Sequence, residues 1–180
     1  MEIQDTFIEG LKIIKPKVFF DKRGYFYESY NESAFRKAGL MMRFVQDNES
    51  KSNKGVLRGL HFQLPPYSQG KLIRVIKGRV IDVVVDLRKN SANYGKHYSI
   101  ELSEENKLMF YIPEGFAHGF LTLEDNTIFN YKCTNVYHPE SEAGIMWNDK
   151  DLEIDWNIEN PIISDKDTKN ISFKDFVSPF

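Results

Sequence analysis

Cysteine is almost absent from this sequence, because Cys133 is the only one among 180 residues. A single thiol cannot build a disulfide framework within the chain, so we expect a reducing, cytoplasmic setting. Cys133 lies in a strand-like run, where a buried packing role fits better than that of a nucleophile.

Long hydrophobic runs and a strong charge of one sign are also missing. No run approaches the ~18 apolar residues of a membrane span. The first ten residues, MEIQDTFIEG, lack the basic start and the apolar stretch that form a secretory signal. The formal net charge is −2 and the lysines and arginines are dispersed, which excludes the basic field that broad nucleic-acid binding needs. The sequence therefore predicts neither a membrane nor a nucleic-acid partner. A small anionic ligand, which needs only a few local cations, stays possible.

Aromatic residues, by contrast, are plentiful, with 14 phenylalanines and nine tyrosines. Such side chains pack well on pleated surfaces. Many short strand-like runs separated by turn signals, with little helix between them, predict an all-β sandwich or barrel. We expect one domain over residues 1–180. The expected strands are Leu11–Val18, Gly24–Tyr30, Phe44–Ser50, Val56–Phe62, Lys71–Lys77, Arg79–Leu87, His97–Leu102, Met109–Ile112, Ala117–Leu123, Ile128–Thr134 and Gly144–Trp147.

Two local patterns are more specific. The run Val80–Asp86 is almost continuously apolar, as expected of a strand buried on both faces. Asn31 can cap a helix over Glu32–Ala38, which Gly39 would close. A further short helix is expected near the C-terminus, where the last twenty residues are more polar and would wrap the outside.

One motif resembles the cupin family of double-sheet jelly rolls. The stretch Pro113–His118 (PEGFAH) matches the family pattern P-x-G-x-x-H, a tight turn that feeds a strand. The family's other motif carries H-x-H and then a Glu, but here only His61 remains and Lys71 stands at the Glu position, seven residues before Gly78. A protonated lysine repels a metal ion and offers it no lone pair. The resemblance thus implies a cupin-type double-sheet jelly roll with a few short peripheral helices, and no metal site.

Longer segments resemble the dTDP-4-dehydrorhamnose 3,5-epimerase family, and together they run from about Leu11 to Thr168. They are Phe19–Asn31, Phe44–Gln63, Gln69–Arg88, Asn106–Leu123 and Ser164–Asp167. The resemblance implies an isomerase without metal or redox cofactor. It would convert dTDP-4-keto-6-deoxy-glucose, a nucleotide sugar, into dTDP-4-keto-L-rhamnose. It also implies a homodimer.

The chemistry of such an epimerase needs a base, stabilisation for an enolate oxygen and an acid on the opposite face of the sugar. His61 is the candidate base, because a good fraction of imidazole is neutral near pH 7. The resemblance assigns Asp167 as its orienting carboxylate, although Asp165 is two residues away. Lys71 is the candidate enolate stabiliser. Tyr131 is selected as the acid by the resemblance alone, since nine tyrosines compete for that role.

The remaining candidates bind the substrate. Guanidinium groups pair with phosphate through two hydrogen bonds, so arginines suit the diphosphate, and an aromatic ring suits stacking on the thymine. The resemblance implies that, in a homodimer, Arg23 and Glu28 would come from the partner subunit. The candidates are Arg23 and Arg58 for the diphosphate, Glu28, Gln46 and Asn48 for the pyrimidine or ribose, Tyr137 for stacking, and His118, Glu142 and Lys166 for further contacts.

Other interpretations stay open at this level. His118 is as well explained as a buried structural histidine, and Glu142 and Lys166 as solvated surface groups. A related epimerase that inverts one carbon, or uses another 4-keto sugar, would need the same proton-transfer residues. Two alternatives belong to other functional classes. One is a metal-dependent cupin enzyme, and the other is a non-catalytic module that binds a carbohydrate or a nucleotide.

Overall fold

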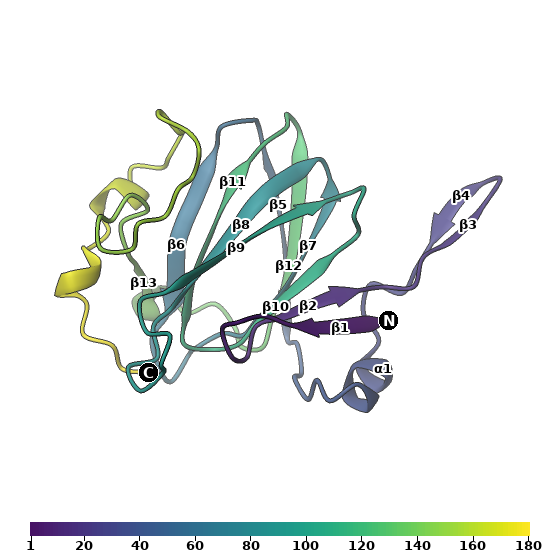
Figure 1. Cartoon of the computed structure of the whole chain (residues 1–180), viewed down its shortest axis with the longest axis horizontal. Coiled ribbons are helices and arrows are strands. Elements are labelled where there is room, and N and C mark those ends of the chain that lie inside the picture. The colour runs from purple at the N-terminus through teal and green to yellow at the C-terminus, as the bar shows by residue number, and fades with distance from the viewer.

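The fold was analysed in a computed structural model that describes residues 1–180, and two antiparallel sheets packed face to face dominate it (Figure 1). One sheet has the order β1-β2-β10-β7-β12-β5, with β1 Glu2–Asp5, β2 Lys12–Lys15, β10 Met109–Ile112, β7 Lys71–Lys77, β12 Thr127–Cys133 and β5 Gln46–Ser52. The other has the order β13-β6-β11-β8-β9, with β13 Glu142–Gly144, β6 Leu57–Gln63, β11 Phe116–Thr122, β8 Arg79–Asp86 and β9 His97–Ser103. The predicted all-β double-sheet jelly roll is confirmed.

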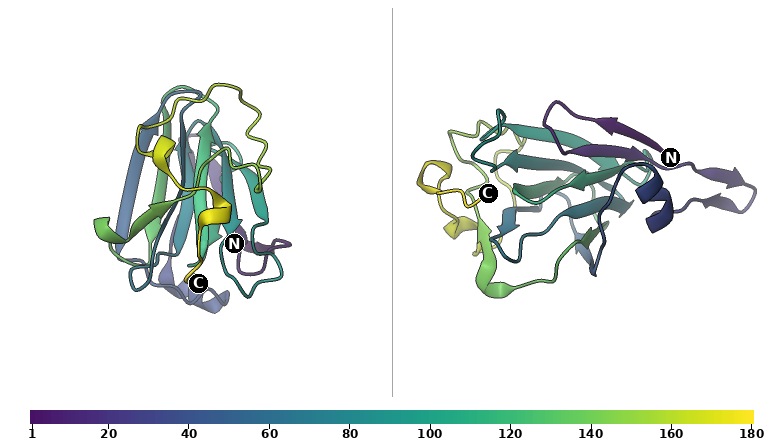
Figure 2. Two further views of the ribbon diagram at one scale, coloured as in Figure 1. Left: turned by 90° about the vertical axis from the view of Figure 1, so that its left-hand side faces the viewer. Right: turned by 90° about the horizontal axis from the view of Figure 1, so that it is seen from below.

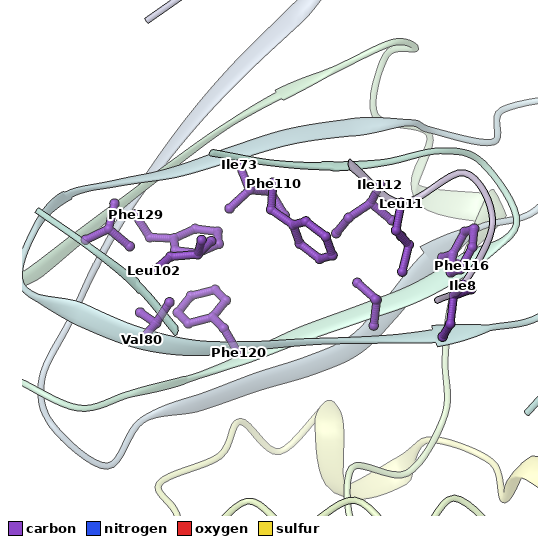
Figure 3. Close-up of a cluster of buried hydrophobic side chains, with 12 residues drawn as sticks. Ile8, Leu11, Ile73, Val80, Leu102, Phe110, Ile112, Phe116, Phe120 and Phe129 are labelled. Atoms are coloured by element: carbon purple, nitrogen blue, oxygen red, sulfur yellow. The ribbon is translucent and has the colours of Figure 1, made fainter. Parts of the chain in front are cut away.

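The main core lies between the two sheets, where twelve buried hydrophobic side chains form one cluster (Figure 3). Successive residues of a strand point to opposite faces. On β8, Val80 and Val84 therefore join this inner cluster, whereas Val83 and Val85 pack on the outer face of their sheet. The prediction that this strand is buried on both faces is confirmed.

Each sheet also has an apolar outer face with its own cover. The chain after β13 lies against the outer face of the five-stranded sheet, where Leu152, Trp156 and Phe176 are buried (Figure 1). The helix α1, Glu32–Lys37, covers the outer face of the six-stranded sheet with Phe35. The peripheral helices are short, as expected: besides α1 they are 3₁₀ turns at Pro139–Ser141, Asp167–Lys169 and Phe173–Asp175.

The start and end of α1 follow the predicted signals. Asn31 has an extended backbone, and its side-chain oxygen accepts a hydrogen bond from the Ala34 amide at 3.1 Å. Gly39 adopts a φ of +84°, a left-handed conformation that favours glycine. The helix ends at Lys37, one residue before the predicted end, and Ala38 is its C-cap.

The expected strands differ from the observed ones mainly at the N-terminus. Strands β1 and β3, Phe19–Asp21, were not expected, and the predicted strand Gly24–Tyr30 is real only over β4, Gly24–Phe26. The strand expected over Gly144–Trp147 is instead β13, which ends at Gly144. These strands are short and exposed or lie at sheet edges, so their hydrophobic pattern is weak.

Strands β3 and β4 form a hairpin that projects away from both sheets, as the view from below also shows (Figures 1 and 2). It carries four exposed aromatic side chains, which are Phe19, Phe20, Tyr25 and Phe26. A solvated hairpin of this composition leaves apolar area without a partner in the chain. No helix of the structure has the length and apolar character needed to cross a membrane.

Candidate active site

Polar side chains replace hydrophobic ones at several inward positions of the sandwich. On β7, β11 and β12, the alternation that places Ile73, Phe120 and Phe129 in the inner cluster also turns Lys71, His118 and Tyr131 inward. Strand register brings these positions together: Lys71 lies opposite Cys133, and His118 lies opposite His61. On β11 the polar position lies between apolar ones, because Phe116 and Phe120 on either side of His118 both belong to the inner cluster.

A β-bulge in β6 turns two functional side chains to the same face. The pairing with β11 joins His61 to His118 and Arg58 to Phe120, so two residues of β6 lie opposite the single Gly119. Arg58 and His61 both face the interior although three positions separate them. Glycine is required here, because a Cβ on Gly59 would lie 2.5 Å from the Gly119 Cα.

These side chains line a cavity of about 430 Å³, within the usual size range of small-molecule sites. His61 on β6 and Tyr131 on β12 belong to different sheets and face this cavity from opposite walls, with Lys71 also in the lining. The same three residues line an adjoining hollow of about 250 Å³. The two spaces thus form one continuous site, with room for a sugar and for a group attached to it.

His61 is held by Asp167, which comes from the 3₁₀ turn after β13. The ring Nε2 donates a hydrogen bond to Asp167 Oδ1 at 2.5 Å, and Nδ1 is left free of protein partners. Asp167 is 2% exposed, whereas Asp165 is exposed. Burial acts to raise the pKa of the Asp167 carboxyl, but hydrogen bonds from His61 and Gly59 outweigh it and hold the pKa below its usual value. A buried carboxylate that orients an imidazole is the arrangement expected of a general base.

The opposite wall holds an ammonium beside a phenol. Lys71 Nζ lies 5.9 Å from the centre of the Tyr131 ring. Burial lowers the pKa of Lys71, and the nearby Cys133, Asp82 and Glu142 act against that shift. Burial also raises the pKa of Tyr131, so its phenol stays protonated over a wider pH range. A protonated phenol and a desolvated cation are suited to donate a proton and to stabilise negative charge.

Asp82 is a member of this site that the sequence did not single out. It is completely buried in β8, its Oδ2 is hydrogen-bonded to His118 Nε2 at 2.8 Å, and its Oδ1 has no partner. Burial raises the pKa of Asp82 and lowers that of His118. The signal in the sequence was an aspartate between Ile81 and Val83, in a run where packing alone would favour another apolar residue.

Four of the nine expected substrate-binding residues line the adjoining hollow. Its lining includes Gln46, Asn48, Tyr137 and Glu142. The Tyr137 hydroxyl donates to Glu142 Oε2 at 2.6 Å, and Lys166 Nζ pairs with the same oxygen at 2.5 Å. Burial acts to raise the pKa of Glu142, but its bonds to Lys166 and Tyr137 prevail and lower it. Lys166 and Glu142 are thus bonded to each other at the mouth of the site.

The three remaining candidates lie outside the lining of the adjoining hollow. Arg58 stands at the rim of the main cavity, where Nε and Nη2 each donate to Ser52 Oγ at 3.1 Å. Arg23 lies at the turn of the projecting hairpin and pairs with Asp21 at 2.5 Å. Glu28 is exposed after β4 and accepts a hydrogen bond from Asn31. Within one chain, neither Arg23 nor Glu28 reaches the cavity.

The sequence and the fold were compared with known proteins. A sequence model described as dTDP-4-dehydrorhamnose 3,5-epimerase matches residues 5–175. The chain belongs to this epimerase family. It is 58% identical to the dTDP-4-dehydrorhamnose 3,5-epimerase of Methanothermobacter thermautotrophicus, with 90% of this chain and 89% of that one covered.

Two solved structures, the first of a dTDP-4-dehydrorhamnose 3,5-epimerase and the second of a dTDP-6-deoxy-D-glucose-3,5-epimerase, are similar to this chain throughout. The enzyme from Elizabethkingia anophelis has a TM-score of 0.92 at 53% identity, and the match covers 97% of both chains. The enzyme from Legionella pneumophila, in complex with dTDP-4-keto-L-rhamnose, has a TM-score of 0.91 at 48% identity, with 95% and 92% covered. All of the candidate residues, from Arg23 to Asp167, lie inside the range that the family model matches.

A metal of the cupin type does not fit this member of the dTDP-4-dehydrorhamnose 3,5-epimerase family. No three of its His, Cys, Asp and Glu side chains are grouped so as to hold a metal ion. Lys71 lies in the cavity wall with His61 and His118, where a cupin metal would need an anionic ligand. Asp167 and Asp82 are each committed to one of these histidines.

Asp167→Asn is expected to lower the free energy of unfolding by about 1.5–3 kcal/mol at pH 7, the range for hydrogen bonds to a charged group. A carboxyl whose pKa is lowered by folding contributes stability above its unfolded pKa, near ~3.9, and loses it as the pH falls through the folded value. The difference from the wild type should therefore shrink below about pH 4. Urea denaturation at pH 7 and in acid measures this, with the exposed Asp165→Asn as control. A difference that persists unchanged in acid would contradict the assignment.

Proposed function

We propose that this chain inverts C3 and C5 of dTDP-4-keto-6-deoxy-glucose to give dTDP-4-keto-L-rhamnose, without a metal or redox cofactor. One observation carries the proposal: an imidazole held by a carboxylate and a phenol line the same cavity from opposite sheets. An inversion next to a ketone needs a base on one face of the sugar and an acid on the other. Family membership over residues 5–175 supports the substrate.

Each inversion is two proton transfers. His61 takes the proton from the carbon beside the ketone, and the bonding electrons move to the C4 oxygen, which becomes an enolate. The phenol of Tyr131 then delivers a proton to the other face of the same carbon, and the electrons return to re-form the ketone. The sugar neither gains nor loses atoms or electrons. The imidazolium and the phenolate left behind must exchange protons, directly or through water, before the second inversion.

The enolate oxygen is proposed to lie against Lys71, in the part of the cavity that the ring of His118 also lines. A cation in a water-poor cavity stabilises developing negative charge far more than it would in water. Lys71 and His118 belong to opposite sheets and both line the main cavity. The buried carboxylate of Asp82, bonded to His118, would keep that ring in a fixed orientation.

The nucleotide is proposed to occupy the adjoining hollow and its rim. Arg58 suits the diphosphate, since guanidinium binds phosphate through two parallel hydrogen bonds. Tyr137 offers a half-exposed ring for the thymine, and Gln46 and Asn48 offer amides for the base or the ribose. Glu142 and Lys166 would close the mouth.

We further propose a homodimer, each subunit a single domain of residues 1–180, acting in the cytoplasm. The hairpin β3–β4 exposes four aromatic rings and projects beyond its own sheets (Figure 2). Arg23 and Glu28 lie on or next to it and away from the cavity of their own chain. In a dimer they would reach the partner's cavity and complete its diphosphate and nucleoside contacts.

The test is incubation with dTDP-4-keto-6-deoxy-glucose in deuterated water, followed by NMR with and without a chelator. Two deuterons, one at C3 and one at C5, with the rhamno configuration in the product, are expected. One deuteron would support a single epimerase instead. Loss of activity with chelator would support a metal-dependent cupin, and no exchange at all would leave only a binding module.

Activity is expected to fall as the pH rises through the pKa of Lys71, which burial places below the usual value for lysine. Lys71→Met should lower kcat by about 10²–10³, the loss typical of one donor to a developing oxyanion. Lys71→Arg keeps its charge at every accessible pH, so its residual activity should extend to higher pH. The measurement is kcat against pH, with the exposed Lys77→Arg as control. An alkaline limb unchanged in Lys71→Arg would remove Lys71 from this role.

A further inference from the structure

The ring of Tyr137 stands half exposed on the segment that follows β12, yet it is held from two directions. Its hydroxyl donates to Glu142 Oε2 on β13, and its backbone amide donates to Gln46 Oε1 on β5 at 2.7 Å. Strands β13 and β5 belong to different sheets. The segment carrying Tyr137 therefore bridges the two sheets at the open end of the barrel.

The residues on either side of Tyr137 are held by one buried amide. Gln63 Nε2 donates to the Val136 carbonyl at 3.2 Å, and the His138 backbone amide donates to Gln63 Oε1 at 2.8 Å. Gln63 is only 5% exposed. The amide nitrogen and the amide oxygen of Gln63 thus both bond the backbone on either side of Tyr137.

The same amide also ties in a second segment. Gln63 Nε2 donates to the Tyr67 carbonyl at 2.6 Å, and the Tyr67 ring stacks on the His138 ring with 3.8 Å between centres and 3° between planes. Gln63 thereby joins residues 136–138 to the loop after β6. Removing its donor would free both segments together.

The position of Gln63 in its sheet links the proposed base to the residue that holds the Tyr137 hydroxyl. It is the last residue of β6, two positions after His61, and on β13 its register partner is Glu142. The strand that carries the proposed base thus also fixes the backbone around Tyr137, and the neighbouring strand fixes its hydroxyl. Preorganised aromatic groups bind better because less freedom is lost when the ligand arrives.

We propose that Gln63 is a positioning residue that holds Tyr137 as a preformed stacking platform for the base of a nucleoside diphosphate. The inference rests on the proposed function, since it takes Tyr137 to contact the base. It assigns a role to a residue that need not touch the substrate. It also separates nucleotide affinity, which Gln63 would control, from proton transfer, which it would not.

A double-mutant cycle tests this, with dTDP as the probe and calorimetry of the full-length protein as the measurement. Tyr137→Ala should weaken dTDP binding roughly 5- to 150-fold, the range for loss of one aromatic–base stack. Gln63→Glu keeps the acceptor for His138 but loses both donated bonds, and should weaken binding about 5-fold or more within that range. In the Tyr137→Ala background, Gln63→Glu should cause no further loss. Turnover by Gln63→Glu should show a raised KM with kcat nearly unchanged.

Asn135→Asp is the control for the added negative charge. Asn135 lines neither cavity, and the change keeps the oxygen that accepts from the Val136 amide at 2.9 Å while it removes only the bond donated to the Pro66 carbonyl at 3.3 Å. Its affinity for dTDP should stay near that of the wild type. Pyrophosphate, which has no base, should bind Gln63→Glu as tightly as it binds the wild type. Gln63→Met, uncharged and of similar length, runs through the same cycle in case the carboxylate prevents folding.

Additive losses in the cycle, or equal weakening of dTDP and pyrophosphate, would overturn the inference while leaving the proposed reaction intact. Wild-type binding of dTDP by Tyr137→Ala would overturn it too, because no platform would then exist. Failure of the proposed function has a separate sign, namely no deuterium uptake by the wild-type protein from dTDP-4-keto-6-deoxy-glucose. The dTDP cycle is read independently of that result.

Discussion

His61→Ala is expected to abolish deuterium incorporation at both C3 and C5 of the substrate, while dTDP still binds. The imidazole of His61 lines the cavity, and the buried carboxylate of Asp167 holds its Nε2 while Nδ1 is left free to accept a proton. Removing a general base costs about 10²–10⁴ in rate, and both inversions depend on the same base. NMR in deuterated water measures the exchange, and calorimetry with dTDP measures binding.

A second histidine provides the control for this experiment. His97 lies on β9 outside the cavity lining and bonds the Leu152 carbonyl at 3.0 Å, so His97→Gln should exchange deuterium like the wild type. Exchange at the wild-type rate in His61→Ala would eliminate His61 as the base. Loss of dTDP binding together with exchange would instead point to a collapsed site.

Tyr131→Phe is expected to stop formation of the inverted product while some deuterium exchange survives. The change removes only a hydroxyl, so the ring keeps its contact with Phe129 at 6.1 Å between centres. His61 would still remove a proton and return a deuteron from its own side, which labels the sugar without inverting it. Product formation should fall by about 10²–10⁴, the contribution of one general acid. NMR separates the two results, because labelled substrate and inverted product differ in their couplings.

The matched control is Tyr111→Phe. Tyr111 lies on β10 of the same sheet, packs on its outer face near α1, and does not line the main cavity. Its variant should epimerise normally. Epimerisation at the wild-type rate by Tyr131→Phe would reject Tyr131 as the acid, and loss of all exchange would show that its hydroxyl is needed for proton removal as well.

Strand limits, the helix cap and the turn after the helix could be predicted from the sequence. Strands β7 and β10 begin and end at the predicted residues. Asn31 caps α1 with its side chain, as predicted, and Gly39 after the helix has the positive φ that glycine favours. Such features depend on neighbouring residues alone: alternation sets a strand, and a capping oxygen sets a helix start. The N-terminal strands were missed because their few residues are exposed and carry little pattern.

Only some of the residues of the site could be predicted from the sequence. The motif around His61 and the cupin-like spacing of Lys71 indicated a base and a cation, but Tyr131 was chosen from nine tyrosines by family resemblance alone. Asp82 was overlooked, because a buried aspartate in an apolar strand gains a meaning only when its partner His118 is known. Arg23 and Glu28 carried the expected chemistry but lie on or beside a hairpin away from their own cavity.

The sequence by itself determined the class of this protein, an all-β chain without a disulfide framework. It also showed polar residues within strands that are otherwise apolar. Only the tertiary structure decided which of them meet. The bulge at Gly59 turns Arg58 and His61 to one face, Asp167 reaches His61 across 106 positions, and Tyr131 faces them from the other sheet. These contacts depend on register and on loop closure between distant segments, which no local pattern encodes.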